Sequence, residues 1–200
     1  MRVSDFTLTI VSLVSRTVFG QAESSANFRK RDEPVTYSTA QLSDLQCIRE
    51  AAQRYCRGVD RLDEALMKSA YWPEATDDHG VYVGNAMPFV EMCMVSHLRW
   101  RSTSHCIFNH HIELDADGTH ARGEIYNVTY LFQKNADVLE TWHGRYLDQY
   151  EKRGNEWRII ERVCVHEGTH SEPIKPMAID AHKFRQGSFD RPSQGRPPGP

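Results

Sequence analysis

Three side chains in the sequence have the types needed for proton transfer, and two of them, Asp60 and His105, come from distant segments. Asp60 follows Gly58 and Val59 in an apolar stretch at the end of a predicted helix. A carboxylate in such surroundings must be hydrogen-bonded or paired, because an isolated charge loses its hydration there. It could also cap the next helix, although Asp63 is better placed for capping, which leaves Asp60 free for another role.

His105 opens a predicted strand. Side chains alternate along a strand, so we expect His105 to share a face with Ile107 and Asn109. His110 and His111 point to opposite faces, so only one of them can share that side. Histidine suits general base catalysis near neutral pH, and a carboxylate on its far nitrogen fixes the tautomer and stabilises the imidazolium. Taken alone, a strand histidine is also compatible with a structural role.

Tyr55 is the third side chain, and it lies five residues before Asp60. It falls on the apolar stripe of the same predicted helix. From there its hydroxyl could be directed at a substrate oxygen or a leaving group, or the ring could simply belong to the core.

One motif suggests a metal. Residues 166–170 read His-Glu-Gly-Thr-His, which matches the zinc-protease pattern. That chemistry needs a helix, so that both histidines share a face. Here the segment follows a predicted strand, contains Gly168 and Thr169, and precedes Pro173. We therefore expect a strand end at the rim of a pocket and no metal site.

The first predicted helix positions Asp60 and Tyr55. Ser43 or Asp44 can cap it, and Gly58 weakens it near its end, so Asp60 should fall in its last turn or just beyond. Its apolar stripe consists of Leu45, Ile48, Ala52, Tyr55 and Val59.

Two shorter helices and a strand follow. Asp63 caps the second helix, which runs to about Tyr71 because Pro73 prevents its continuation. A turn, a short strand and a third helix with Pro88 in its first turn complete this half, at residues 77–80, 81–83 and from about 88 to 97.

The second half of the chain has strand periodicity. Four strands are expected, at residues 105–114, 121–132, 138–152 and 157–165. Helices followed by a long antiparallel meander indicate an α+β fold, with about three helices on the concave side of a curved, mostly antiparallel sheet. Such a sheet closed by helices forms a cone, whose interior is a ready pocket.

Composition limits the alternatives. The 200 residues carry a net charge of −3 without a basic stripe, so no nucleic acid partner is expected. The five cysteines form no CxxC pair, which argues against disulfides and against structural zinc and fits a cytoplasmic location. The apolar run at residues 6–14 is too short and too polar to span a membrane, although a cleaved signal peptide is the alternative.

We expect three regions: a leader at residues 1–37 that is poorly ordered, one domain at 38–184, and a Pro- and Gly-rich disordered tail at 185–200.

Several segments resemble the SnoaL-like family of the nuclear transport factor 2 superfamily. They are Ile48-Arg49-Glu50 with residues 54–63 (Arg-Tyr-Cys-Arg-Gly-Val-Asp-Arg-Leu-Asp), residues 72–75 (Trp-Pro-Glu-Ala), residues 144–151 (Gly-Arg-Tyr-Leu-Asp-Gln-Tyr-Glu), and residues 156–159 (Glu-Trp-Arg-Ile). The resemblance covers about residues 40–170 and implies a cone-shaped, nuclear transport factor 2-like fold. This superfamily contains both enzymes and non-enzymes.

Within the family, the pattern is most similar to hexachlorocyclohexane dehydrochlorinase, scytalone dehydratase and bile acid 7α-dehydratase. The resemblance implies cofactor-free elimination, in which His105 removes a proton, Asp60 orients it and Tyr55 assists the leaving group. Asn109 matches a position of the dehydrochlorinase. Those enzymes also carry a further pocket residue on the last strands.

Several residues are therefore candidates for substrate binding: Asn109, Arg145, Arg162, His166 and Trp72, with His170 as a further possibility. The expected substrate is a hydrophobic, ring-bearing small molecule. Exposed aromatic and Val side chains on the outer sheet face suggest a homodimer or homotrimer.

Three functions remain open from the sequence. The first is a lyase of the dehydratase or dehydrohalogenase type. The second is a polyketide cyclase or ring isomerase that uses the same base to form an enolate. The third is a non-catalytic module that binds a small molecule or supports oligomers, which a large separation of Asp60 from His105 would favour.

Overall fold

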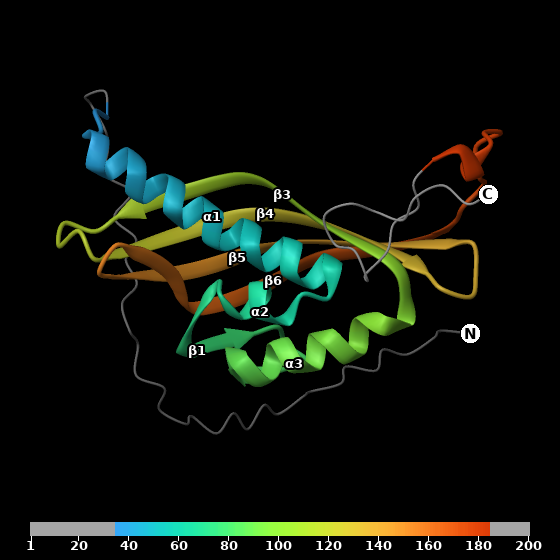
Figure 1. Ribbon diagram of the computed structural model, residues 1–200, viewed down its shortest axis with the longest axis horizontal. Coiled ribbons are helices and arrows are strands. Elements are labelled where there is room, and N and C mark those ends of the chain that lie inside the picture. The colour runs from blue at the N-terminus through green and yellow to red at the C-terminus, as the bar shows by residue number, and fades with distance from the viewer. Residues whose placement is uncertain (1–34, 185–200) are drawn as a thin grey trace, which may run out of the picture. The chain divides into compact units, whose positions relative to one another are not determined.

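The computed structural model describes residues 35–184 (Figure 1). Most of the expected leader and the whole of the expected tail lie outside the described residues. All the helices and strands belong to one unit that begins at Tyr37.

Helix α1 (Thr39–Arg61) is longer than predicted at its N-terminus. Its N-cap is Ser38, which forms a capping box with Gln41, so the expected cap at Ser43 or Asp44 is wrong. The predicted apolar stripe is confirmed, since all five of its members are buried. Asp44 instead accepts hydrogen bonds from Lys152 Nζ at 2.7 Å and Trp157 Nε1 at 2.9 Å, which tie the helix to the sheet.

The end of α1 is fixed by a close contact with α2 (Glu64–Lys68). A Cβ at Gly58 would lie 2.6 Å from backbone atoms of Met67, so only glycine allows this approach. Leu62 then takes a left-handed conformation (φ 51°), and Asp63 caps α2 as predicted. Asp60 therefore lies in the last turn of α1, as expected.

Strand β1 (Tyr71–Asp78) was not predicted: the expected second helix reaches its first residue, and the expected turn covers its last two. Pro73 suggested a break, but it lies where the parallel pairing with β6 is irregular, between Tyr71 and Thr76. β1 also pairs with the short β2 (Val83–Asn85).

Helix α3 (Ala86–Ser96) starts at the N-cap Asn85 and has Pro88 in its first turn, as predicted. A short 3₁₀ helix, η1 (His97–Arg99), then leads into the sheet.

Four long strands form most of the sheet: β3 (Trp100–Leu114), β4 (His120–Gln133), β5 (Val138–Arg153) and β6 (Glu156–Pro173). The order across the sheet is β2-β1-β6-β5-β4-β3, and only the β1–β6 pairing is parallel. A second short 3₁₀ helix, η2 (Ala181–Lys183), follows.

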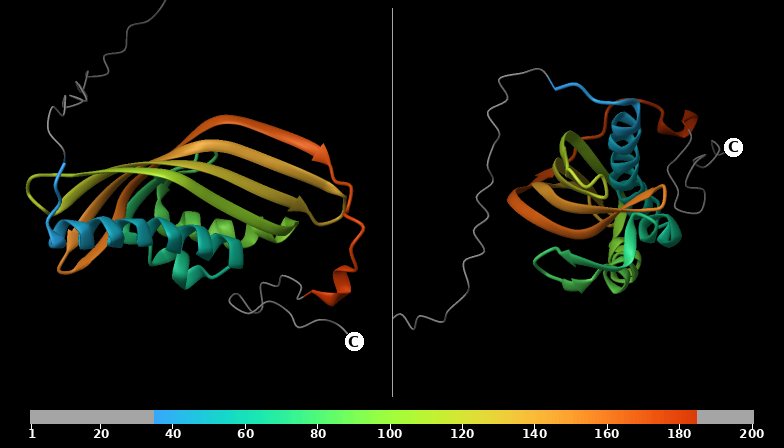
Figure 2. Two further views of the ribbon diagram at one scale, coloured as in Figure 1. Left: turned by 90° about the horizontal axis from the view of Figure 1, so that it is seen from above. Right: turned by 90° about the vertical axis from the view of Figure 1, so that its left-hand side faces the viewer.

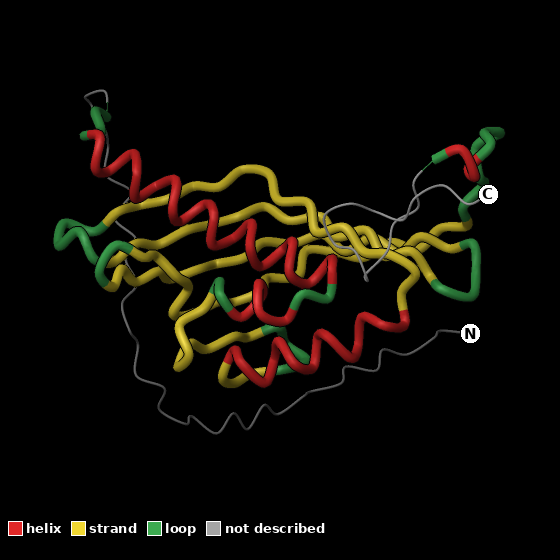
Figure 3. Tube along the Cα trace, viewed as in Figure 1, coloured by secondary structure: helices red, strands yellow, loops and turns green. Residues whose placement is uncertain are grey.

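The helices α1, α2 and α3 lie on one side of the curved sheet, and the strands arch over them (Figures 2 and 3). The core fills the space between these layers, with Ile48 from α1, Met67 from α2, Val90 from α3 and Ile125 from β4 all fully buried. The fold is the expected α+β cone with a mostly antiparallel sheet. Among the described residues, no helix is long and apolar enough to cross a membrane.

Candidate active site

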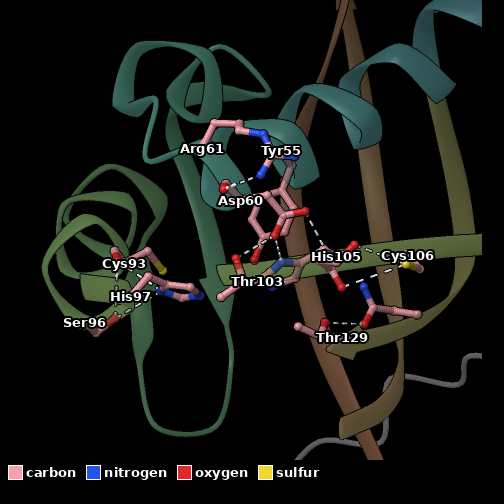
Figure 4. A network of polar contacts seen from close by, with 12 residues as sticks. Tyr55, Asp60, Arg61, Cys93, Ser96, His97, Thr103, His105, Cys106 and Thr129 are labelled. Atoms are coloured by element: carbon pink, nitrogen blue, oxygen red, sulfur yellow. Dashed lines mark hydrogen bonds and ion pairs between the residues drawn. The ribbon is translucent and has the colours of Figure 1, made fainter. Parts of the chain in front are cut away.

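Asp60 and His105 meet between the helical layer and the sheet (Figure 4). The carboxylate Oδ1 of Asp60 lies 2.6 Å from Nδ1 of His105. The two side chains are 13% and 9% exposed, so neither faces bulk water. The last turn of α1 and the first half of β3, 45 residues apart in sequence, thus form one hydrogen-bonded pair.

The Asp60 carboxylate is held by two further donors. Thr103 Oγ1 donates to Oδ1 at 2.8 Å, and the backbone N–H of His105 donates to Oδ2 at 2.8 Å. Burial raises the pKa of Asp60, but the His105 imidazole and these hydrogen bonds outweigh it, so the pKa lies below its usual value. Asp60 is therefore a fixed anion at neutral pH.

The other nitrogen of His105, Nε2, makes no hydrogen bond to any described residue. Enclosed side-chain nitrogen or oxygen atoms without a partner occur only at Arg54 Nε and Arg162 Nη1 within residues 35–184, so the unbonded His105 Nε2 keeps some accessible surface. Because Asp60 binds Nδ1, the neutral ring presents its lone pair at Nε2. This is the geometry that a general base requires.

Tyr55 lies beside this pair, in contact with the buried cation of Arg162. The Tyr55 ring stands edge-on to the His105 ring at a centroid distance of 6.4 Å, and its hydroxyl lies 3.2 Å from His79 Nε2. Arg162 stacks over Tyr55 and Tyr146 with its guanidinium carbon at 4.3 and 4.1 Å from the ring centroids. The structure therefore brings Arg162 to the site through Tyr55.

Arg162 is itself paired with Asp148 by two hydrogen bonds of 2.7 Å. Both side chains are fully buried. Tyr150 donates to Asp148 at 2.6 Å, and its hydroxyl also lies 3.3 Å from His110 Nε2. This polar network touches the site through the Arg162–Tyr55 contact, and its buried partners are mutually satisfied except at Arg162 Nη1.

Asn109 is not part of the site. The register between β3 and β4 shifts between Ile107 and His110, so Phe108 and Asn109 form a bulge opposite a single residue of β4. Asn109 is exposed as a result, and His110 takes the inward position. The expectation that Asn109 shares a face with His105 is therefore wrong, because the bulge breaks the alternation.

Arg145 also lies away from the site. It is on the opposite face of β5 from Tyr146, where it pairs with Glu124 at 2.5 Å and Glu167 at 2.8 Å. Its expected role in substrate binding has no support from this position.

Trp72 has a packing role. Its Nε1 donates to the carbonyl of Glu151 at 3.0 Å. Arg153 and Arg158 stack on its ring with guanidinium carbons 4.4 and 4.7 Å from the centroid. None of these contacts involves Asp60 or His105, so Trp72 belongs to a different part of the structure.

His166 and His170 lie on β6 and are exposed, with a helix nowhere in this segment. The expected strand is confirmed, although it continues to Pro173. His166 pairs in register with Gly144 and its ring lies 6.0 Å from that of Trp142. Within the described residues, no three His, Cys, Asp or Glu side chains are grouped as metal ligands.

A hollow of about 370 Å³ lies at one end of the sheet, by the β4–β5 hairpin. Neither Asp60 nor His105 lines it; its walls are Arg99, Trp100, Gln133, Lys134, Asn135 and Glu140. The hollow contains no imidazole–carboxylate pair comparable to Asp60–His105.

Sequence reasoning missed four polar residues around the site. Thr103 could have been found by strand alternation, since it lies two residues before His105. His97 could have been suspected from its position on the apolar stripe of the third helix. Asp77 and His79 gave no usable signal, because residues 77–80 were expected to form a turn, whereas Asp77 lies in β1 and His79 directly follows that strand.

The comparisons with known proteins agree with this architecture. A family model described as a SnoaL-like domain matches residues 40–163. No curated protein sequence matches the chain significantly.

Solved structures share the fold at low sequence identity. A hexachlorocyclohexane dehydrochlorinase of type 2 has a TM-score of 0.62 at 16% identity, covering 70% of this chain and 98% of its own. A scytalone dehydratase-like protein from Novosphingobium aromaticivorans has a TM-score of 0.60 at 14% identity, covering 70% and 97%. A protein of unknown function from Mycobacterium tuberculosis has a TM-score of 0.56 at 20% identity, covering 64% and 73%. With its α+β cone and the family match over most of its described length, the chain belongs to the SnoaL-like family of the nuclear transport factor 2 superfamily.

Proposed function

We propose that this protein is a cofactor-free lyase of the dehydratase or dehydrohalogenase type that acts on a hydrophobic, ring-bearing small molecule. The observation that carries the proposal is the Asp60–His105 hydrogen bond of 2.6 Å with His105 Nε2 left open. Elimination also agrees with the names of two structural neighbours, a dehydrochlorinase and a scytalone dehydratase-like protein.

His105 is the general base in this proposal. Its Nε2 takes a proton from a substrate carbon, and the resulting imidazolium is stabilised by the Asp60 carboxylate at Nδ1. Thr103 and the His105 backbone N–H keep that carboxylate from rotating. A positioned base of this kind contributes roughly 10²–10⁴-fold to the rate.

The surroundings of the pair favour an apolar substrate. Aromatic rings of Tyr55 and Tyr146 lie next to each other at 5.7 Å, and Ile107, which follows His105 on the same face, packs against the core. Tyr55 and Tyr146 are each only 2% exposed, so these rings form an apolar packed background to the pair, against which a strongly hydrated substrate would lose its hydration without replacement.

The same base would serve a polyketide cyclase or a ring isomerase, because both reactions also begin with proton removal. Product mass distinguishes them from elimination: loss of water or hydrogen halide lowers the mass, and isomerisation leaves it unchanged. A non-catalytic binding module is a weaker candidate, because a buried imidazole–carboxylate pair by itself adds little stability.

The test uses purified wild-type protein, His105→Ala and Asp60→Ala. The probes are cyclic β-hydroxyketones of one to three rings, and 5-nitrobenzisoxazole, whose ring opens on simple proton abstraction. We expect His105→Ala to lose at least about 100-fold in turnover and Asp60→Ala a comparable factor. His111→Gln is the matched control, because His111 is a neighbouring strand histidine whose side chain is 58% exposed.

Turnover by His105→Ala equal to that of the wild type would eliminate the proposed mechanism. Thermal unfolding of each variant is measured in parallel, so that loss of activity is separated from loss of the fold.

A further inference from the structure

A second imidazole–carboxylate pair, His79 and Asp77, lies beside Tyr55. His79 Nδ1 contacts Asp77 Oδ1, and the other Asp77 oxygen accepts a hydrogen bond from Tyr71 at 2.6 Å. Asp77 is 1% exposed, so this carboxylate is enclosed and fully engaged. The Tyr55 ring is a neighbour of both histidines, with its centroid 6.3 Å from that of His79 and 6.4 Å from that of His105.

The His79 ring is held on every side. Asp77 comes from β1, which ends one residue before His79, Tyr55 from α1, Phe89 from α3 at a stacked distance of 4.4 Å, and Tyr146 from β5 at 6.0 Å. The His79 side chain nevertheless keeps 17% of its surface exposed, whereas Tyr55 is only 2% exposed. His79 therefore connects an enclosed phenol to solvent.

The direction of the Tyr55–His79 hydrogen bond depends on the charge of His79. With Nδ1–H donated to Asp77, a neutral His79 has a lone pair at Nε2, and the Tyr55 hydroxyl donates to it. A protonated His79 donates Nε2–H to the Tyr55 oxygen instead, which frees the phenolic hydrogen for another acceptor. The pair can thus control whether Tyr55 has a proton to give.

Tyr55 needs such a partner to act as an acid. Burial, followed by the neighbouring tyrosines, raises the pKa of Tyr55 well above its usual value, so a free phenolate at this position is strongly disfavoured. The phenol therefore gives up its proton most readily when it receives another at the same time. His79 is the group in position to supply it.

We propose that Asp77 and His79 form a second proton-transfer unit, which supplies through Tyr55 the proton that the departing group takes. This inference rests on the proposed lyase function. Asp77 is a positioning residue in this scheme, and His79 acts through Tyr55.

The step balances for a hydroxyl leaving group. His105 Nε2 takes the proton from carbon, the C–H electron pair forms the new C=C bond, and the C–O bond breaks. The departing oxygen takes the Tyr55 proton and leaves as water, while the Tyr55 oxygen takes the proton from His79 Nε2. His105 then releases one proton to solvent and His79 regains one, so the enzyme returns to its starting state.

The test compares two reactions that need the acid to different extents. Dehydration of a cyclic β-hydroxyketone, 3-hydroxycyclohexanone or its two- and three-ring analogues, requires protonation of the leaving hydroxyl. Ring opening of 5-nitrobenzisoxazole requires only a base, because the phenoxide that it releases is stabilised by delocalisation. The readout is the ratio of the two rates, which a merely structural role of His79 would not change.

We expect His79→Gln to lower the ratio of dehydration to ring opening by at least about tenfold, since an amide cannot transfer a proton. Asp77→Asn should lower it in the same direction. His111→Gln, the exposed control, should leave the ratio unchanged.

The possible failures are distinguishable. An unchanged ratio in His79→Gln, or an equal loss of both reactions, would overturn the inference while leaving the role of His105 intact. If the wild type catalyses neither reaction, the proposed function fails and this inference fails with it.

Discussion

His97 lies beside the proposed base, with its ring centroid 5.9 Å from that of His105. Its Nδ1 lies 3.0 Å from the Cys93 carbonyl and donates to it, so the neutral ring carries its lone pair on Nε2. Burial, followed by the charge of a protonated His105, lowers the pKa of His97 to about 4. His97 is therefore neutral near neutral pH and does not repel a protonated His105, whose counter-ion is the Asp60 carboxylate.

The first prediction concerns stability in mild acid. The pKa of His97 is about 4 in the folded protein and about 6.5 in the unfolded chain, so the unfolded chain binds more protons between these values. The contribution of neutral His97 to the free energy of unfolding is complete above pH 6.5. It is lost as the pH falls towards 4, and the loss is on the order of 3 kcal/mol. His97→Gln should therefore show a smaller fall in the urea unfolding free energy between pH 7 and pH 4.5 than the wild type.

An equal fall in both proteins would contradict this prediction. His110, whose pKa burial also lowers to about 4, provides a second site at which the same measurement can be made.

The second prediction concerns Asp60 at lower pH. Its pKa lies below the usual value of 3.8, so its hydrogen bonds contribute stability above that value, which is lost as the pH falls towards the folded-state pKa. Asp60→Asn should be less stable than the wild type at pH 7, and the difference should shrink below about pH 4. Unfolding free energies of both proteins from pH 7 to pH 3 check this, and a constant difference would count against it.

The third prediction compares two positions on β3. Thr103→Val removes the hydroxyl that donates to Asp60 and should lower turnover of the probes by about tenfold, because the carboxylate loses one of its restraints. Asn109→Ala should leave turnover unchanged, since the bulge places Asn109 outside the site. A loss in Asn109→Ala as large as that in Thr103→Val would show that Asn109 contributes after all.

The fourth prediction concerns the buried Arg162–Asp148 pair. Asp148→Asn leaves the Arg162 charge enclosed without its counter-ion and should destabilise the fold by about 3–5 kcal/mol in urea unfolding. Glu167→Gln is the control, because its pair with Arg145 is partly exposed and should cost less than about 1 kcal/mol. Similar losses in the two variants would refute the distinction between buried and exposed pairs.

Much of the fold could be read from the sequence, because its periodicities are regular. The apolar stripe of α1 and the alternation along β5, in which Tyr146, Asp148 and Tyr150 are buried between exposed Leu147 and Gln149, both follow the expected spacing. These patterns were sufficient for the α+β class and for the four long strands.

The remaining parts depend on contacts that no local pattern reveals. β1 is a strand because it pairs in parallel with the distant β6, even though Pro73 lies within it. The start of α1 was missed because Ser38 precedes an exposed first turn that shows no apolar stripe.

The candidate site was predictable at Asp60, which lies at a helix end as expected, and at His105, although β3 begins at Trp100 and the prediction that His105 opens the strand was wrong. It was not predictable where a bulge or a missed strand intervenes. The bulge at Phe108–Asn109 adds one residue to β3, so that His110 and not Asn109 lies on the inner face. The Asp77–His79 pair was not predicted because β1 was not predicted.

Asn127, on the inner face of β4, donates its side-chain amide nitrogen to Tyr146 at 2.9 Å and accepts from Thr129 at 2.9 Å. With Val128 between them, Asn127 and Thr129 also make up the acceptor tripeptide for N-linked glycans. The amide nitrogen that would carry the sugar is the one already bonded to Tyr146, on a residue only 1% exposed. A glycan on Asn127 would leave no room for β4 to pack on the core, so a chain glycosylated there could not adopt this fold.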